Sequence, residues 1–152
     1  MKLFGLALSI AVLAGIWTFV SPLIAILTWP AFVGWAFFFV AGGDASAIYK
    51  AGAPLISGVI LGYLGVLASA NFGMIGLAIA VAVIAFIMVM MANINLFGVI
   101  PAQFAACASF FGVGDFVGTL IPLIIGVLLG YVSAMLPKWF DTKKNKTEDI
   151  AA

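Results

Sequence analysis

Three polar side chains stand out in an otherwise apolar chain, and each has chemistry that could act on a solute. Gln103 lies inside a predicted membrane-spanning helix, and Asp44 and Asp115 each follow a glycine where such a helix ends. An amide donates and accepts hydrogen bonds, which suits water or a small neutral solute. A carboxylate at the mouth of a pathway attracts a cation or takes up a proton. The structural alternatives are a helix–helix hydrogen bond for the glutamine and helix caps for the aspartates.

Gln103 shares one helical face with Ala106, Cys107 and Phe110, because these residues lie at positions i, i+3, i+4 and i+7. We expect Gln103, Cys107 and Phe110 to line a pore or to pack between helices, and Cys107 to be a packing residue rather than a reactive thiol. The matching face in the first half of the chain carries an aromatic stripe of Phe32, Trp35 and Phe39. Such a stripe either narrows a pore to small solutes or belongs to the core and the lipid-facing surface.

The composition is that of a membrane protein. Of the 152 residues, 66% are hydrophobic and 7% are charged, and the mean hydropathy is +1.36. These values exclude a soluble globular domain, a disordered chain and a nucleic-acid binder. The absence of histidine excludes a histidine-ligated metal and a histidine-based triad, and no other catalytic pattern is present. We therefore expect no enzyme activity, no cofactor and no metal site.

Six spans account for the apolar part of the chain. Between Leu3 and Pro137 the only charged residues are Asp44, Lys50 and Asp115, and a span needs about 20 apolar residues. The predicted spans are approximately 3–20, 22–41, 51–69, 74–92, 96–111 and 116–136. They form a single transmembrane domain over 1–136, and a polar tail, 137–152, is expected to be disordered after its first turn.

Lysine placement orients these spans. Lys2, Lys50 and the tail lysines fall on the same side, which the positive-inside rule assigns to the cytoplasm. Both termini are therefore predicted to be cytoplasmic, with Asp44 on the inner side and Asp115 on the outer side.

An internal repeat links the two halves of the domain. Pro30 and Asp44 lie 71 positions before Pro101 and Asp115, and residues 54–63 match residues 122–131 at eight of ten positions. Repeat 1 covers about 1–70 and repeat 2 about 71–136. Because each repeat holds three spans, the second enters the membrane from the opposite side, which is the inverted-repeat plan of many transporters. Chance similarity between apolar segments is the alternative.

Paired prolines and glycines occupy equivalent places in the two repeats. Pro30 and Pro101 are predicted to kink or break the middle span of each half, and paired interruptions of this kind point to a translocation site, unless they are simple packing kinks. The glycine pairs are Gly58 with Gly62 and Gly126 with Gly130. Small-xxx-small pairs let helices approach closely, so we expect the third and sixth spans to cross there or to form an oligomer contact.

Three segments resemble a known family. They are Leu13-Ala14-Gly15-Ile16-Trp17, Ala31-Phe32-Val33-Gly34 and, above all, the run PAQFAACASFFGVGDF from Pro101 to Phe116. The chain resembles the domain of unknown function 1097 family of small bacterial inner-membrane proteins. The resemblance implies a multi-pass protein of the bacterial inner membrane, and it brings no activity, substrate or site residues.

Three functions fit these observations. The first is a channel or facilitator for a small neutral or weakly polar solute such as water, ammonia, urea or a small amide. The second is a secondary transporter that uses Asp44 or Asp115 for proton or cation coupling, and the third is a scaffold or accessory protein. The expected partners are the lipid bilayer and a solute but no nucleic acid, and the sequence leaves a homo-oligomer open.

Overall fold

The computed structural model describes residues 3–70 and 72–151, with side chains described up to Lys138. This part of the chain forms six α-helices and one short 3-10 turn. The elements are α1 (Phe4–Leu23), α2 (Thr28–Val40), α3 (Ala47–Ser69), α4 (Gly73–Met91), η1 (Asn95–Phe97), α5 (Ile100–Val113) and α6 (Phe116–Ala151). The predicted all-helical fold class is confirmed.

Backbone geometry sets the limits of the two short helices. Before α2, Ala25 has a left-handed φ of 56°, and after it Gly42 and Gly43 have φ values of 123° and 67°. α5 ends at Val113, and the next residue, Gly114, has a φ of 75° and donates its backbone N–H to the Phe110 carbonyl oxygen. Glycine adopts left-handed backbone conformations at little cost, so the glycines end these helices where the sequence predicts.

Helix lengths differ from the prediction of six similar spans. Within the described residues, four helical segments are long and apolar enough to cross a membrane: α1, α3, α4 and the Phe116–Lys138 part of α6. α2 and α5 contain 13 and 14 residues, or about 20 Å of helix, against about 30 Å of hydrocarbon. The predicted second span, 22–41, was too long because residues 24–27 are not helical. The expected disordered tail also differs, since α6 continues to Ala151.

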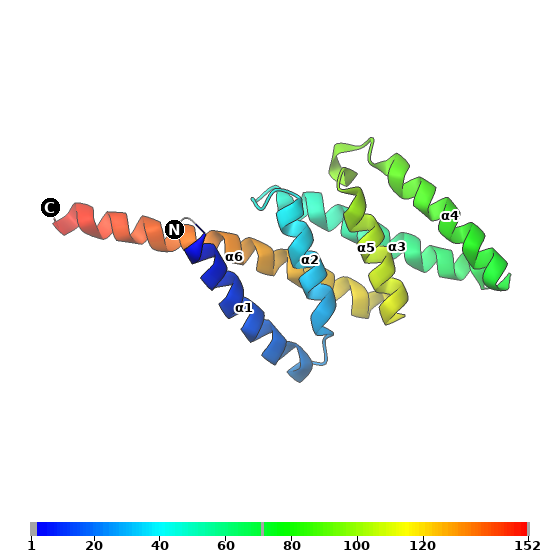
Figure 1. The fold of residues 1–152 in the computed structure, drawn as a ribbon, viewed down its shortest axis with the longest axis horizontal. Coiled ribbons are helices and arrows are strands. Elements are labelled where there is room, and N and C mark those ends of the chain that lie inside the picture. The colour runs from blue at the N-terminus through cyan, green and yellow to red at the C-terminus, as the bar shows by residue number, and fades with distance from the viewer. Residues whose placement is uncertain (1–2, 71, 152) are drawn as a thin grey trace.

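The helices pack as two three-helix units, and each unit takes one of its helices from the other half of the chain. α2 packs mainly on α6, and α5 packs mainly on α3. α1 also contacts α6, and α4 contacts α3. We call α1, α2 and α6 the first unit and α4, α5 and α3 the second unit. Figure 1 shows α1 and α4 at opposite sides of the molecule, and α2 and α5 running side by side in opposite directions.

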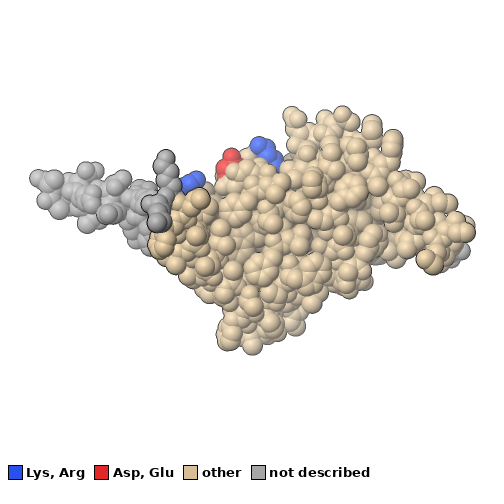
Figure 2. Space-filling view, viewed as in Figure 1, with Lys and Arg blue, Asp and Glu red and all other residues tan. Residues whose placement is uncertain are grey.

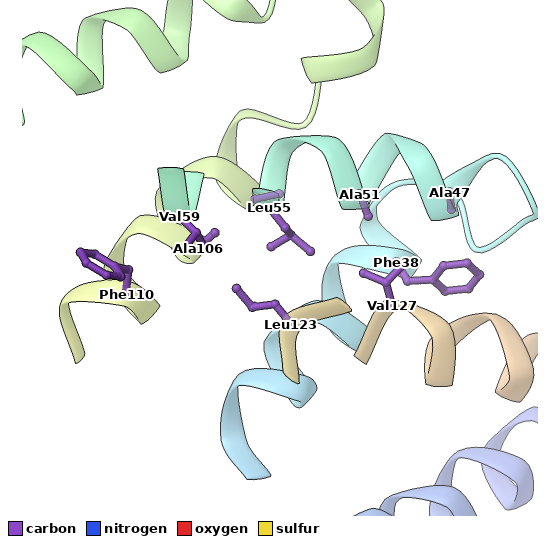
Figure 3. Packing of buried hydrophobic residues seen from close by; sticks show 10 residues of the cluster. Phe38, Ala47, Ala51, Leu55, Val59, Ala106, Phe110, Leu123 and Val127 are labelled. Carbon is purple, nitrogen blue, oxygen red and sulfur yellow. The ribbon is translucent and has the colours of Figure 1, made fainter. Parts of the chain in front are cut away.

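The core lies where the two units meet. Fully buried Leu55 and Val59 of α3 and Leu123 and Val127 of α6 belong to one apolar cluster, to which α2 adds Phe38. Figure 3 shows Leu55 and Leu123 pointing toward one another between α3 and α6. Close-packed aliphatic side chains therefore fill the centre of the molecule.

The described surface is overwhelmingly uncharged. α1 and α4 leave most of their apolar side chains exposed, as expected for helices that face lipid. On the face drawn in Figure 2, the few charged side chains lie along one edge of the molecule. This distribution agrees with an apolar body bounded by charged loops.

Candidate functional site

Gln103 is the polar centre of the second unit. Its side chain is fully buried in the first turns of α5. Nε2 donates to the carbonyl oxygens of Met88 and Phe97, each at 3.3 Å. Oε1 is buried without a hydrogen-bond partner among the described residues. An unpaired buried carbonyl costs about 1–3 kcal/mol, so the amide holds α5 to α4 and η1 while leaving one acceptor unused.

The prolines occupy the first turns of the two short helices. Pro30 is the third residue of α2, and Pro101 is the second residue of α5. Proline is tolerated there because the first backbone N–H groups of a helix have no intrahelical acceptor. The structure thus has no proline kink in the middle of α2 or α5: each proline marks the start of a short helix that follows a non-helical segment.

The helical face that starts at Gln103 is buried against α3 and α4. Cys107 lies with Ile84 and Met88 of α4 in a small apolar cluster, and its Sγ lies close to the backbone of Gly62. Phe110 is 4% exposed and meets the Tyr63 ring edge-on, with ring centroids 6.0 Å apart. The structure therefore brings Gln103, Cys107 and Phe110 together on one face.

The aromatic residues predicted as a stripe on α2 differ in burial. Trp35 is buried and donates its Nε1–H to Ser133 Oγ at 3.1 Å. Phe32 is 39% exposed and stacks on Trp35, whereas Phe39 is only half-buried. The ring that fills the core is Phe38, which the sequence analysis did not select.

Both mouth carboxylates bind the start of the helix that follows them. Asp44 Oδ1 accepts hydrogen bonds from Ser46 Oγ at 2.7 Å and from the Ala47 N–H at 3.0 Å. The Ser46 hydroxyl, followed by backbone N–H groups and the charge of Lys50, lowers the pKa of Asp44 despite some opposing desolvation. Asp115 Oδ2 accepts the Gly118 N–H at the start of α6. Each carboxylate thus acts as a helix cap.

The paired glycines do not mark a crossing of α3 and α6. Gly58 lies against the Gln103 carbonyl oxygen of α5, and Gly126 lies against the Ala31 carbonyl oxygen of α2. Gly62 faces Phe110 and Cys107, and Gly130 faces Phe38. The prediction that α3 and α6 cross at these glycines is therefore wrong. The glycines let each long helix approach the short helix of its own unit. Larger side chains lie between α3 and α6.

An apolar groove opens between α3 and α4. It has a volume of about 690 Å³, and its lining includes Leu61, Gly65, Gly76, Ala80 and Ile84. Leu61 and Ile84 also contact the cluster that contains Cys107 and Met88. The groove therefore shares two lining residues with the cluster of Met88, whose carbonyl oxygen accepts a hydrogen bond from Gln103.

Polar bonds across the first unit were missed from the sequence. Ser9 Oγ donates to the Ser133 carbonyl oxygen at 2.7 Å, and Trp17 Nε1 donates to the Thr28 carbonyl oxygen at 3.0 Å. Ser21 and Thr28 share a hydroxyl–hydroxyl bond of 2.6 Å. The available signal was the presence of serine, threonine and tryptophan in otherwise aliphatic helices, but their partners depend on how α1 packs against α2 and α6.

Fold and surface together define the class: an all-helical, multi-pass membrane protein. The chain belongs to the family described as protein of unknown function (DUF1097), which matches residues 7–138 and confirms the resemblance seen in the sequence. It is 30% identical over 150 residues to inner membrane protein YcdZ of Escherichia coli (strain K12), covering 95% of this chain and 91% of that protein. Inner membrane protein YcdZ of Salmonella typhimurium is 26% identical over 148 residues, covering 95% and 92%. No solved structure matches the chain.

Proposed function

We propose that the two units are inverted repeats related by a pseudo-two-fold axis between α3 and α6. The opposite courses of α2 and α5 support this relation. Ring contacts recur as well: Phe38 meets Tyr131 at 6.4 Å and Phe110 meets Tyr63 at 6.0 Å, both nearly perpendicular. The buried Ala31, Gly34, Trp35 and Phe38 lie 72 positions before the buried Gln103, Ala106, Cys107 and Phe110. The offset for α2 and α5 is thus one residue longer than the proline alignment gives.

The orientation follows from the same arrangement. With α2 and α5 each crossing the membrane together with the non-helical segment before it, the termini and Lys50 share one side. The positive-inside rule assigns that side to the cytoplasm. Short helices joined to unwound backbone are typical of the crossing elements that form transport sites.

We infer that the protein is a channel or facilitator for a small neutral or weakly polar solute in the inner membrane. The observation that carries this inference is the unpaired Oε1 of fully buried Gln103. A carbonyl oxygen inside a membrane protein needs a donor, and a passing water, ammonia, urea or amide molecule supplies one. Oε1 of Gln103 can then bind one solute molecule after another while Nε2 keeps its hydrogen bonds to Met88 and Phe97.

The route runs through the second unit, because aliphatic side chains fill the centre between α3 and α6. Ile84 lines the groove between α3 and α4 and packs with Met88 and Cys107, and the Met88 carbonyl oxygen accepts a hydrogen bond from Gln103. Movement of the flexible Met88 side chain opens the route by which a solute passes from the groove to Gln103. The pathway therefore belongs to one chain and does not require a central pore between copies.

Solute flux into liposomes that contain the purified full-length protein tests this function. Water, urea and ammonia entry are followed by stopped-flow light scattering and by an internal pH dye. Gln103→Leu is expected to lower the solute flux roughly fivefold to tenfold. This factor corresponds to the loss of one hydrogen bond of about 1–1.4 kcal/mol between the protein and the solute. Ser109→Ala is the matched control, because Ser109 is buried on the same helix but bonds only its own Ala105 carbonyl oxygen.

Two results would overturn the proposal. No flux of any of the three solutes would leave a scaffold or accessory role. Flux that requires a proton gradient and disappears in Asp115→Asn would replace the facilitator with a proton-coupled transporter. Circular dichroism and gel filtration of each variant separate a lost pathway from a lost fold.

A further inference from the structure

A second hollow lies at the junction of α5 and α6, away from Gln103. It has a volume of about 530 Å³ and is lined by Ile60, Tyr63, Val66, Phe110, Gly114, Asp115 and Phe116. Three of these residues are aromatic and one is a carboxylate. This combination differs from the α3–α4 groove, whose lining has no charged side chain.

The aromatic rings form the walls of this hollow from more than one direction. The Tyr63 ring lies 6.0 Å from that of Phe110 at 86°, and 5.5 Å from that of Phe116 at 63°. Rings set at such steep angles cannot all lie flat against one surface. The π-face of an aromatic ring carries partial negative charge and attracts cations.

Asp115 adds a full negative charge at the edge of the rings. Its Oδ2 caps α6 through the Gly118 N–H, and Oδ1 accepts no hydrogen bond from the described residues. No lysine among the described residues forms an ion pair with this carboxylate. Its charge is therefore available to a cation that enters the hollow.

The equivalent place in the first half lacks this combination. Asp44 is followed by Ala45, where Asp115 is followed by Phe116. Ser46 donates a hydrogen bond to Asp44, and the charge of Lys50 acts on the same carboxylate. The ring pair of Phe110 and Tyr63 recurs as Phe38 and Tyr131, but only Asp115 is followed by a third ring. Only Asp44 has a side-chain hydroxyl donor and the charge of a nearby lysine.

We propose that the hollow formed by Tyr63, Phe110, Asp115 and Phe116 binds an organic ammonium group. A substituted ammonium ion presents an apolar surface to the rings and a positive charge to the carboxylate, whereas a strongly hydrated metal ion would lose its water to aromatic walls that offer no ligands. The group comes either from a phosphatidylethanolamine headgroup or from a free amine. This site is independent of the facilitator role proposed for Gln103.

Binding of tetramethylammonium to the full-length protein in phosphatidylglycerol nanodiscs tests the site. Saturation-transfer NMR is expected to detect the ion, and tert-butanol, a neutral probe of similar shape, is expected to give no comparable signal. Asp115→Asn keeps an N-cap side chain, and Tyr63→Leu removes a partly exposed ring. Each is expected to weaken binding roughly fivefold to tenfold, because a cation–π or charge contact of this kind contributes about 1 kcal/mol or more. Asp44→Asn is the matched control and should bind like the wild type.

The outcome decides both the site and its source. Equal binding to wild type and Asp115→Asn, equal loss in Asp44→Asn, or equal signals from tert-butanol would overturn the proposal. If the natural occupant is a headgroup, adding phosphatidylethanolamine to the nanodisc weakens tetramethylammonium binding to the wild type, and if it is a free amine the affinity does not change. Because solute flux is not measured, failure of this test leaves the facilitator proposal standing.

Discussion

The two three-helix units have the same outline but are held together by different chemistry. In the first unit, Ser9 and Trp35 both bond to Ser133 of α6, and Trp17 bonds to the start of α2. In the second unit, the side chain of Gln103 makes the only bonds from a described side chain to another element, and one of its atoms stays unpaired. Among the described residues, the buried polar side-chain atoms of the first unit all have hydrogen-bond partners, whereas in the second unit Gln103 Oε1 has none.

The groove reflects the same difference. Under the proposed repeat, Ser9 and Ser133 correspond to Ala80 and Gly65, which line the groove between α3 and α4. In the first unit a hydroxyl bridges α1 and α6 at this place, whereas in the second unit small side chains leave space. Under this correspondence, two small apolar residues line the groove where the first unit has two serines.

The largest expected effect concerns the contact between α2 and α6. Gly126→Ala should destabilise the protein by about 3 kcal/mol or more, because the new methyl group meets the backbone carbonyl of Ala31 and two packed helices must move apart. Gly62→Ala in the second unit should cost about 1 kcal/mol, because it meets Cys107 and Phe110 side chains that can shift. Unfolding titrations in mixed micelles measure both.

Gly52→Ala is the control for this pair. Apart from the adjacent residues and backbone of its own helix, no atom lies within 4 Å of a methyl group at Gly52, so the greater helix propensity of alanine should leave stability unchanged or slightly raised. Equal losses in Gly126→Ala and Gly62→Ala would show that a facing backbone and facing side chains resist an added methyl group equally, whereas Gly58→Ala, which meets the Gln103 carbonyl oxygen, should lose about as much as its counterpart Gly126→Ala.

Sequence patterns predicted the ends of the helices better than the contacts between side chains of different helices. Glycine positions predicted where α2 and α5 end, and the residue spacing predicted that Gln103, Cys107 and Phe110 share one helical face. The start of α2 at Thr28 could not be predicted, because residues 24–27 are as apolar as the helices around them and only the backbone at Ala25 interrupts the helix. The role of Phe38 rather than Phe39 depends on where α6 packs, which the periodicity of a wholly apolar helix does not specify.

The next effect concerns the polar bonds of the first unit. Ser133→Ala should cost about 1–1.5 kcal/mol, because it leaves the buried Nε1–H of Trp35 without an acceptor. Adding Trp35→Phe removes the orphaned donor, so the double variant should lose less than the sum of the two single losses. Ser69→Ala in the second unit should have a smaller effect, since Ser69 bonds only the Val66 carbonyl oxygen of its own helix. Additive losses in the double-mutant cycle would contradict this interpretation.

A smaller, stabilising effect is expected from giving the second unit a polar bridge. Ala80→Ser places a hydroxyl where it can donate to the Gly65 carbonyl oxygen, as Ser9 donates to that of Ser133. The gain should be about 0.6 kcal/mol, the average for such bonds in membranes. Ala78→Ser, on the exposed face of α4, is the control and should give no gain. A matching gain in both variants would show that the bridge is not specific to the groove.

The smallest effect concerns the pH response of the loop between α2 and α3. Because hydrogen bonds hold the pKa of folded Asp44 below 3.8, its contribution to stability is present above that value and is lost as the pH falls through the lowered pKa. Ser46→Ala removes the strongest cause, so the pKa of Asp44 should rise, and the contribution should be lost at a higher pH. Lys50→Gln removes the weakest cause and should shift the pKa less. Carbon-13 NMR of the Asp44 carboxyl group between about pH 2 and 6 measures both shifts, and a larger shift in Lys50→Gln would mean that charge rather than the serine hydroxyl controls this end of the molecule.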